Sequence, residues 1–410
     1  MDLFFPNPLV RRRMYDGPLG PYVDFYAAEL RDEGYGWHSG ILQIGLVADF
    51  SRWLAQRGTG VHEVSPKLCQ SYLRYRARLR RPLGGDRAAL KRLLNLLLRQ
   101  GVISAPPAAA ATPAAQVQDE YRLYLQQERS LASETVEPYL RFVGEFLDAC
   151  FGTGPVDLSS LSTADVLGFV ERRAASIHSQ RVKKMTTALR SFLRFARFRG
   201  NLNTDLAACV PAVSNWSQSN IPKALPQAQV ELVLASCKRQ SPVSRRDYAI
   251  LLLLARLGLR AGEIVALTLE DLDWQAGLIR LHGKVSRYSQ LPLPVDVGEA
   301  IVDYLRNGRP RVANRCVFVR TKAPLVALKD AAAIAAVVRR ALARAGIDPP
   351  RKGSHQFRHS LACQMLRQGA TLAEIGEVLR HRSPNTTAIY AKVDVSSLAT
   401  LALPWPGGAP

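Results

Sequence analysis

The chain has 410 residues, with 55 Lys and Arg against 34 Asp and Glu, which gives a net charge of +21 at pH 7. This length exceeds one ordinary hydrophobic core, so two or three domains are expected, and the charge favours a polyanionic partner such as nucleic acid. The longest apolar run near the middle, residues 249–255, is too short to span a bilayer, and no signal peptide is recognised at the start of the chain. The six cysteines form no CxxC pair, so we expect neither a disulfide framework nor a thiolate zinc site. The protein is therefore expected to be cytoplasmic.

Two Pro-containing segments with few charges, residues 102–116 and 213–227, predict linkers between domains. They divide the chain into an N-terminal module over residues 1–103, a second module over residues 117–212 and a C-terminal domain over residues 222–410.

Both N-terminal segments carry apolar residues near i, i+3 and i+4, which predicts two all-α helical modules. The two segments can be aligned with each other: Tyr26 falls on Tyr121, 95 residues later, and Gly101 falls on Gly200, 99 residues later. This pattern predicts a duplicated module whose loops differ in length. The alternative is that any two amphipathic helical stretches align this well.

Each module also has a basic run that lacks the acidic residues of ordinary surface helices. A charge run is usually a solvated face, but the scarcity of acids here favours phosphate contacts. The predicted DNA contacts are Arg74, Arg76, Arg78, Arg81, Lys91, Arg92, Arg181, Lys183, Lys184, Arg190 and Arg194.

The C-terminal segment changes character. Residues 246–258 predict a buried helix that ends at Gly258 as a left-handed cap. Alternating apolar residues then predict a small sheet, so this domain is expected to be α+β. The elements expected after this helix are strands over residues 277–284, 289–294 and 316–320 and helices over 296–308 and 331–346.

Candidate chemical groups gather toward the C-terminus. Residues 354–369 predict a helix on which His355 and Arg358, three residues apart, share a face. The capping-box sequence TLAE, residues 371–374, predicts a second helix that delivers His381 at its end.

A further helix is expected to begin at Ser383 and Pro384 and to carry Tyr390 two turns in. Upstream, Arg260 lies in a turn just past a buried helix, and Lys284 lies in the turn after the first long strand. Tight turns between helices could bring these groups together.

Other site types are not indicated. The GLIRLHGKVS stretch has the wrong glycine spacing, and a Val where a phosphate-binding nucleotide loop needs Ser or Thr. His355 and His359 lack the glutamate and third ligand of a zinc protease, and no clustered carboxylates suggest two-metal chemistry. No cofactor and no metal are expected.

These motifs, taken in order, carry a resemblance. Residues 222–393 resemble the catalytic domain of the tyrosine recombinase (phage integrase) family through LGLRAGEI, HGK, HQFRH, LRHRS and TTAIYAKV. Residues 117–212 resemble the helical core-binding domain of that family. One departure is Arg380, because the family usually has glycine before the second histidine. This residue adds a cation near the site and puts the local turn geometry, or full activity, in question.

The resemblance implies a site-specific DNA recombinase or integrase that forms a 3′-phosphotyrosyl intermediate without a metal. Tyr390 would be the nucleophile, Arg260 and Arg358 would hold the phosphate oxygens through bidentate hydrogen bonds, and Lys284 would protonate the leaving 5′-oxygen. His355 would accept the tyrosine proton, and His381 would bind the phosphate. The site residues are thus Arg260, Lys284, His355, Arg358, His381 and Tyr390.

The family further implies double-stranded DNA as partner, a homo-tetramer on two DNA sites, which could include other recombinase subunits, no membrane association and a nucleoid location. The apolar tail, residues 395–406, is expected to dock on a neighbouring subunit or to fold back on its own. A transposase with the same chemistry, a type IB topoisomerase and a catalytically impaired DNA-binding accessory protein are the alternatives. The N-terminal module is expected to extend the DNA contact, with a protein-binding role in assembly as the rival.

Overall fold

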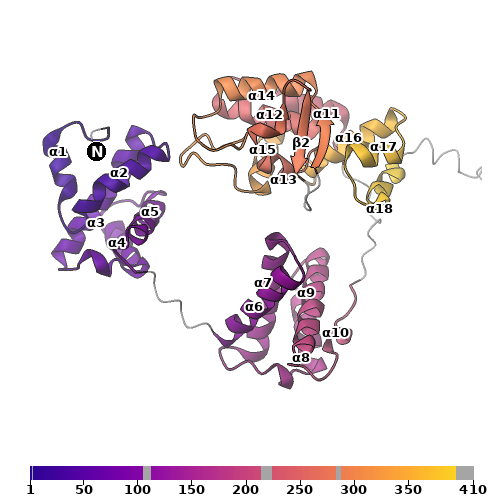
Figure 1. Cartoon of the computed structure of the whole chain (residues 1–410), viewed down its shortest axis with the longest axis horizontal. Helices are drawn as coiled ribbons and strands as arrows, with labels where there is room; N and C mark the ends of the chain where they lie inside the picture. The colour runs from indigo at the N-terminus through magenta and orange to yellow at the C-terminus, as the bar shows by residue number, and fades with distance from the viewer. Residues whose placement is uncertain (2, 105–111, 214–223, 283–287, 394–410) are drawn as a thin grey trace, which may run out of the picture. The chain divides into compact units, whose positions relative to one another are not determined.

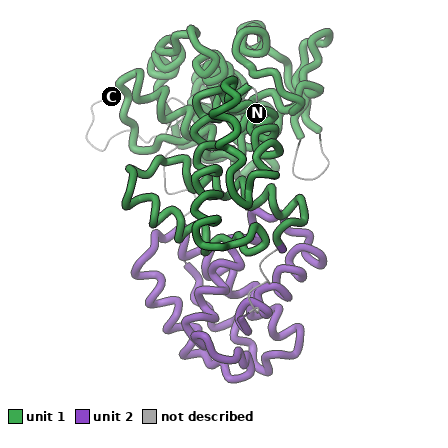
Figure 2. Tube along the Cα trace, turned by 90° about the vertical axis from the view of Figure 1, so that its left-hand side faces the viewer, with its two compact units in different colours: residues 1–103, 220–410 green, residues 104–219 purple. Residues whose placement is uncertain are grey.

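Two compact units make up the chain, one of residues 1–103 with 220–410 and one of residues 104–219 (Figure 2). All elements before residue 213 are helical, and the C-terminal part adds a small sheet, so the predicted fold class is confirmed. The division into three domains stays a prediction. The residues described by this computed structural model are 1, 3–104, 112–213, 224–282 and 288–393.

The N-terminal module has an aromatic core. Phe50 and Trp53 of α3 pack against Tyr72 of α4, with ring centroids 4.8 and 5.6 Å from the tyrosine ring. Helix α4 begins after Ser65, whose hydroxyl accepts a hydrogen bond from the backbone N–H of Leu68. The helices of this module are α1 (Pro8–Arg12), α2 (Val23–Asp32), α3 (Trp37–Gln56), α4 (Pro66–Leu79) and α5 (Asp86–Arg99).

The unit of residues 104–219 is a second helical bundle. Tyr121 packs against Phe192 and Phe195 with both centroid distances at 5.3 Å, and Phe146 meets Phe169 edge-on at 5.3 Å. These rings fill the space between helices from the two ends of the segment. The helices are α6 (Pro113–Leu123), α7 (Ser133–Phe151), α8 (Thr163–Ala174), α9 (Ser179–Phe198) and α10 (Leu206–Cys209).

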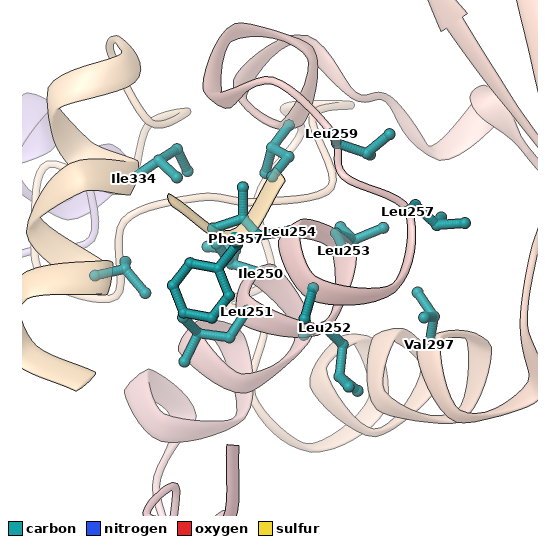
Figure 3. Packing of buried hydrophobic residues seen from close by; sticks show 14 of the residues in the cluster. Ile250, Leu251, Leu252, Leu253, Leu254, Leu257, Leu259, Val297, Ile334 and Phe357 are labelled. Atoms are coloured by element: carbon teal, nitrogen blue, oxygen red, sulfur yellow. The ribbon is translucent and has the colours of Figure 1, made fainter. Parts of the chain in front are cut away.

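The C-terminal part is organised around α12, whose residues 249–255 are all buried (Figure 3). A helix that is apolar on every face must be covered on every face, and Val297, Ile334 and Phe357 come from three other helices to cover it. The predicted buried helix and its Gly258 cap, with φ +57°, are confirmed. The helices packed here are α11 (Gln227–Ala235), α12 (Pro242–Arg256), α13 (Ala261–Ala266), α14 (Val295–Asn307) and α15 (Ala331–Arg344).

Three antiparallel strands in the order β1-β2-β3 form the sheet (Figure 1). The expected hairpin is confirmed as β2 (Leu278–His282) and β3 (Tyr288–Pro292), and β1 (Leu272–Asp273) was not predicted. On β2, Ile279 and Leu281 face the core, because alternate residues of a strand point to opposite faces.

The strand expected over residues 316–320 is wrong. Within the described ranges, this segment makes two isolated bridges, Thr268 with Cys316 and Val319 with Ala327. The guanidinium of Arg309 explains the difference, because it donates to the backbone carbonyls of Asn314, Cys316 and Val317. The backbone carbonyls that would accept hydrogen bonds from a neighbouring strand are therefore bonded to the Arg309 side chain instead.

The last helices are α16 (His355–Arg367), α17 (Leu372–Val378) and α18 (Pro384–Thr387). The predicted capping box at the start of α17 is confirmed, with the Thr371 hydroxyl accepting from the Glu374 N–H at 3.2 Å. The helix expected to carry Tyr390 two turns in is wrong in detail, because α18 is a single turn that continues as a 3₁₀ helix over Ala388–Val393. Along the described ranges, no helix is long and apolar enough to cross a membrane.

Candidate active site

Arg260 lies in the turn between α12 and α13. Its backbone N–H donates to Oε2 of Glu263 at 2.8 Å, and its Nη1 donates to Oε1 of the same carboxylate at 2.7 Å. Glu263, three residues after Arg260, therefore caps α13, as in a capping box, and also holds the Arg260 side chain in place. Glu263 thus orients Arg260, whose side chain stays 41% exposed.

Gly258 makes this turn compact. At φ +57° it occupies the left-handed region, and a Cβ here would lie 2.9 Å from Leu379 and 3.0 Å from Leu361. Both the backbone conformation and the space therefore require glycine.

Arg358, on the first turn of α16, connects two distant segments. Its Nη1 donates to the carbonyl of Gly258 at 2.6 Å, and its Nη2 donates to the carbonyl of Leu379. Burial, followed by the charges of Arg260 and Arg380, lowers the pKa of this guanidinium to about 10, so it remains charged at neutral pH. A buried cation beside a second arginine is a favourable arrangement for binding an anion.

The residue before the second histidine adopts an uncommon backbone conformation. Arg380 has φ +55°, and the N–H groups of Arg380 and His381 bond back to Glu377 and Gly376 at the end of α17. This is a Schellman cap, in which glycine is the usual residue at the left-handed position. The doubt about turn geometry therefore has a direct answer, since the arginine forms the turn that glycine would form.

The Arg380 side chain closes a network around Glu263. Its Nη2 bonds to Oε2 of Glu263 at 2.8 Å, while its own carbonyl accepts from Nη2 of Arg260 at 3.1 Å. Burial alone would raise the pKa of the Glu263 carboxyl, but the charges of Arg380 and Arg260, with their hydrogen bonds, hold it below its ordinary value. One ionised carboxylate is thus shared by two arginines.

His381 is held by a hydroxyl that the sequence did not single out. Its Nδ1 lies 2.7 Å from Oγ1 of the buried Thr387, three residues before Tyr390. Burial, with the nearby charges of Arg358 and Arg260, lowers the pKa of His381 to about 4, so the ring is neutral at pH 7.

Tyr390 is buried, with 1% of its surface exposed. Its hydroxyl lies 2.9 Å from Nδ1 of His359, and its ring stacks on His381 at a centroid distance of 6.4 Å and an interplanar angle of 7°. Burial raises the pKa of the phenol to about 12, against the charge of Arg358, which lowers it. The phenol is therefore protonated at neutral pH, and it donates this hydrogen bond when the imidazole of His359 carries its proton on Nε2.

His359 is the group that sequence reasoning undervalued. From the sequence it was considered only as a zinc ligand, and the structure places its Nδ1 within hydrogen-bond distance of the hydroxyl of the candidate nucleophile. His355, which was expected to accept that proton, is exposed at the start of α16 and makes no hydrogen bond to Tyr390 among the described residues. Since His359 follows Arg358 directly and lies four residues after His355, no spacing rule distinguished the two histidines.

Of the six predicted site residues, Arg260, Arg358, His381 and Tyr390 are joined through the contacts above, with His355 next to them on α16. Lys284 lies outside the described residues, as does the tail of residues 395–406. No group of three or more His, Cys, Asp or Glu side chains suited to a metal ion occurs in the described parts of the chain.

The predicted DNA contacts divide into two groups. Three of them have partners within their own module: Arg76 pairs with Asp49 at 3.0 Å, Arg92 with Glu33 at 2.8 Å, and Arg190 donates to the Val210 carbonyl at 2.9 Å. Each of these three guanidiniums therefore cross-links two segments of its own module. The exposed members are Arg74, Arg78, Arg81, Lys91, Arg181, Lys183, Lys184 and Arg194.

Known proteins resemble this chain in both parts. A sequence profile of the phage integrase family matches residues 223–397, and a profile of the phage integrase N-terminal SAM-like domain matches residues 119–200. The chain is 48% identical to the proposed integrase/recombinase y4rA of Sinorhizobium fredii over 100% of both proteins. It is 34% identical to the related y4rF of the same organism, over 100% of this chain and 96% of that protein.

The fold has solved counterparts as well. The site-specific recombinase XerH, bound to a palindromic difH substrate after cleavage, superposes with a TM-score of 0.56 at 19% identity, over 82% of this chain and 94% of that one. The family profiles and the related proteins thus define an enzyme class that acts on DNA strands. The chain belongs to the phage integrase family, the tyrosine recombinases, as its motifs predicted.

Proposed function

We propose that the chain cuts one DNA strand with Tyr390 and rejoins strands at a specific site. The observation that carries this proposal is the position of Arg358, whose guanidinium joins the turn of Arg260 to the turn of His381 through two backbone carbonyls. An anion bound by both arginines would lie next to the segment that ends in the Tyr390 hydroxyl. Bidentate arginine contacts stabilise the negative charge that develops on the phosphate.

In the proposed step, the Tyr390 oxygen forms a bond to phosphorus and the bond from phosphorus to the 5′-oxygen breaks. The phenolic proton passes to a neutral histidine, and the 2.9 Å contact supports His359 as the acceptor. Lys284 is proposed to give a proton to the leaving 5′-oxygen. The 3′-phosphotyrosyl bond preserves the energy of the phosphodiester, so a 5′-hydroxyl can reverse the reaction.

Burial of Tyr390 adds a requirement to this mechanism. The hydroxyl of a residue that is only 1% exposed must leave its hydrogen bond with His359 before it reaches a phosphate, so we expect the 3₁₀ segment Ala388–Val393 to move when DNA binds.

Double-stranded DNA is the proposed partner, and the exposed cations of α9, Arg181, Lys183, Lys184 and Arg194, are the proposed backbone contacts in the SAM-like domain. The proposed assembly is a tetramer that binds two DNA sites and could include other recombinase subunits. Its proposed location is the nucleoid, in the cytoplasm. Cross-linking on DNA followed by mass determination tests the stoichiometry.

A second candidate is a catalytically impaired DNA-binding protein, favoured by Arg380, which brings a third arginine to the site. The pairing of Arg380 with Glu263 argues against this candidate, because Arg260 keeps its own bonds to the same carboxylate. A transposase uses the same chemistry and differs in the DNA that it joins.

The test begins with the Tyr390→Phe variant, which selects a preferred site from a pool of random duplexes. A nicked version of that site is then incubated with the unmodified chain, and a covalent protein–DNA adduct is the expected result. The adduct must be absent with Tyr390→Phe. Site-selective binding with no adduct would support the impaired protein, and adducts with relaxation of any plasmid would indicate a topoisomerase.

A further inference from the structure

The N-terminal module repeats the order of elements of the SAM-like domain. Two helices, a 3₁₀ turn and two more helices follow one another in each: α2, α3, Val61–Glu63, α4 and α5 in the first, and α6, α7, Leu158–Ser160, α8 and α9 in the second (Figure 1). The second module differs in a π-helical segment, Tyr124–Glu128, that follows α6. The profile of the SAM-like domain matches residues 119–200. The order of elements alone is weak support, because many helical bundles share it.

The buried positions correspond residue by residue. At five aligned apolar positions both members are buried, and aromatic residues fall on aromatic residues. The pairs are Tyr26 with Tyr121, Leu30 with Leu125, Phe50 with Phe146, Tyr72 with Phe169 and Leu90 with Leu189.

An ion pair also recurs in the same place. Arg76 of α4 bonds to Asp49 of α3 at 3.0 Å, and Arg173 of α8 bonds to Glu145 of α7 at 2.8 Å. Each acid directly precedes an aligned phenylalanine, and each arginine follows an aligned aromatic residue by four positions. Packing of generic amphipathic helices does not require a salt bridge, so its recurrence at this register indicates a copied module.

The ends of the modules agree as well. Gly101 and Gly200 both have positive φ, at +67° and +79°, just after α5 and α9 respectively. The following N–H bonds back across the turn in each case, from Val102 to Leu97 at 3.0 Å and from Asn201 to Ala196 at 2.9 Å.

We propose that residues 1–103 are a second copy of the SAM-like module and that the junction of α4 and α5 is a second binding site for the DNA backbone. Between residues 64 and 100 the only acid is Asp86, which is buried, so this segment itself contributes no exposed carboxylate. The exposed cations at this junction are Arg78, Arg80, Arg81 and Arg87.

The matching junction of α8 and α9 in the SAM-like domain carries Arg181, Lys183 and Lys184, all exposed. Cations thus gather at the same corner of both modules, although the residues are not identical. Phosphates need positive charge and not a particular sequence, so conservation of location is the relevant match. This proposal rests on the proposed DNA partner but not on the chemistry of Tyr390.

The exposed side chains of Leu79 and Leu83, at 65% and 47%, lie in the same junction and would suit a protein partner instead. Salt dependence separates the two, because each phosphate contact releases counterions and contributes about 0.9 to the slope of log binding constant against log salt. A hydrophobic protein contact has no such slope.

The experiment compares the full chain with Arg78→Ala/Arg81→Ala and with a control of equal charge change, Arg12→Ala/Arg31→Ala, which alters exposed residues of α1 and α2. Binding to a long duplex of arbitrary sequence is measured by fluorescence anisotropy over a range of salt concentrations. The expected result is a slope that is smaller by about 2 in the junction variant only.

Equal slopes for the junction variant and the unmodified chain would overturn the proposal. If such a variant also assembles poorly on DNA, the junction contacts protein. If the unmodified chain itself shows no salt-dependent binding to the duplex, the proposal that DNA is its partner is refuted. Failure of strand cleavage leaves this measurement unaffected, because it requires no covalent step.

Discussion

Replacing Arg380 by glycine or by alanine separates the two effects that this residue combines. Both replacements remove the guanidinium that pairs with Glu263, but only alanine retains a Cβ at φ +55°. The difference between the two variants therefore measures the backbone cost alone.

The structure sets the magnitudes. The charged hydrogen bond between Arg380 and Glu263 joins side chains that are 11% and 13% exposed, so its loss should cost about 2 kcal/mol of local stability. The loss is limited because Glu263 keeps its bonds to Arg260. A left-handed residue with a Cβ costs about 1 kcal/mol more than glycine, so Arg380→Gly should be about 1 kcal/mol more stable than Arg380→Ala.

Hydrogen exchange followed by mass spectrometry gives the local readout on peptides covering residues 372–393 of the full chain. A difference of about 1 kcal/mol corresponds to about fivefold slower exchange in Arg380→Gly than in Arg380→Ala. Cleavage rates of the two variants should be alike, because both lack the same charge. Equal or slower exchange in Arg380→Ala would refute the reasoning from the backbone.

Three other predictions concern the same site. Arg358→Lys should lower the rate of covalent-adduct formation by at least about 100-fold, because an ammonium cannot donate in two fixed directions, and circular dichroism should show an intact fold. In single-turnover cleavage at neutral pH, His359→Phe should slow the reaction more than His355→Ala, and the reverse order would restore His355 as the proton acceptor. The pKa of His359 and of His381 is lowered to about 4, whereas an unfolded histidine titrates near 6.5. The unfolded state therefore binds more protons between these values, so unfolding free energy should fall as pH drops from about 6.5 to 4, and less steeply in His381→Asn.

The positions of several helices along the chain could be predicted because the sequence signals that start and end them are local. The apolar run of α12, the capping box before α17 and Gly258 each depend on neighbours within a few residues. The segment at residues 316–320 could not, because its carbonyls are taken by Arg309, a residue whose side-chain direction no pattern encodes.

The candidate site residues were selected from the sequence by their type and order, but their hydrogen bonds could not be predicted. Two histidines on one helix, His355 and His359, are equivalent in sequence terms, and the turn that brings Tyr390 back onto α16 decides between them. Likewise, the ion pairs of Arg76 and Arg92 could not be predicted, because a charge run does not reveal which of its members meet an acid from another helix.

The burial of Tyr390 has a consequence for accuracy. A covalent protein–DNA adduct formed at the wrong site leaves a break in the DNA. A permanently exposed phenol could attack any DNA strand that the protein contacts. If exposure of Tyr390 requires DNA binding, only DNA that binds the protein tightly supplies the free energy for that exposure. Weakly bound DNA then dissociates before the cleavage reaction begins. The enclosed hydroxyl, with its pKa near 12, would then act as a threshold that converts differences in affinity into differences in cutting.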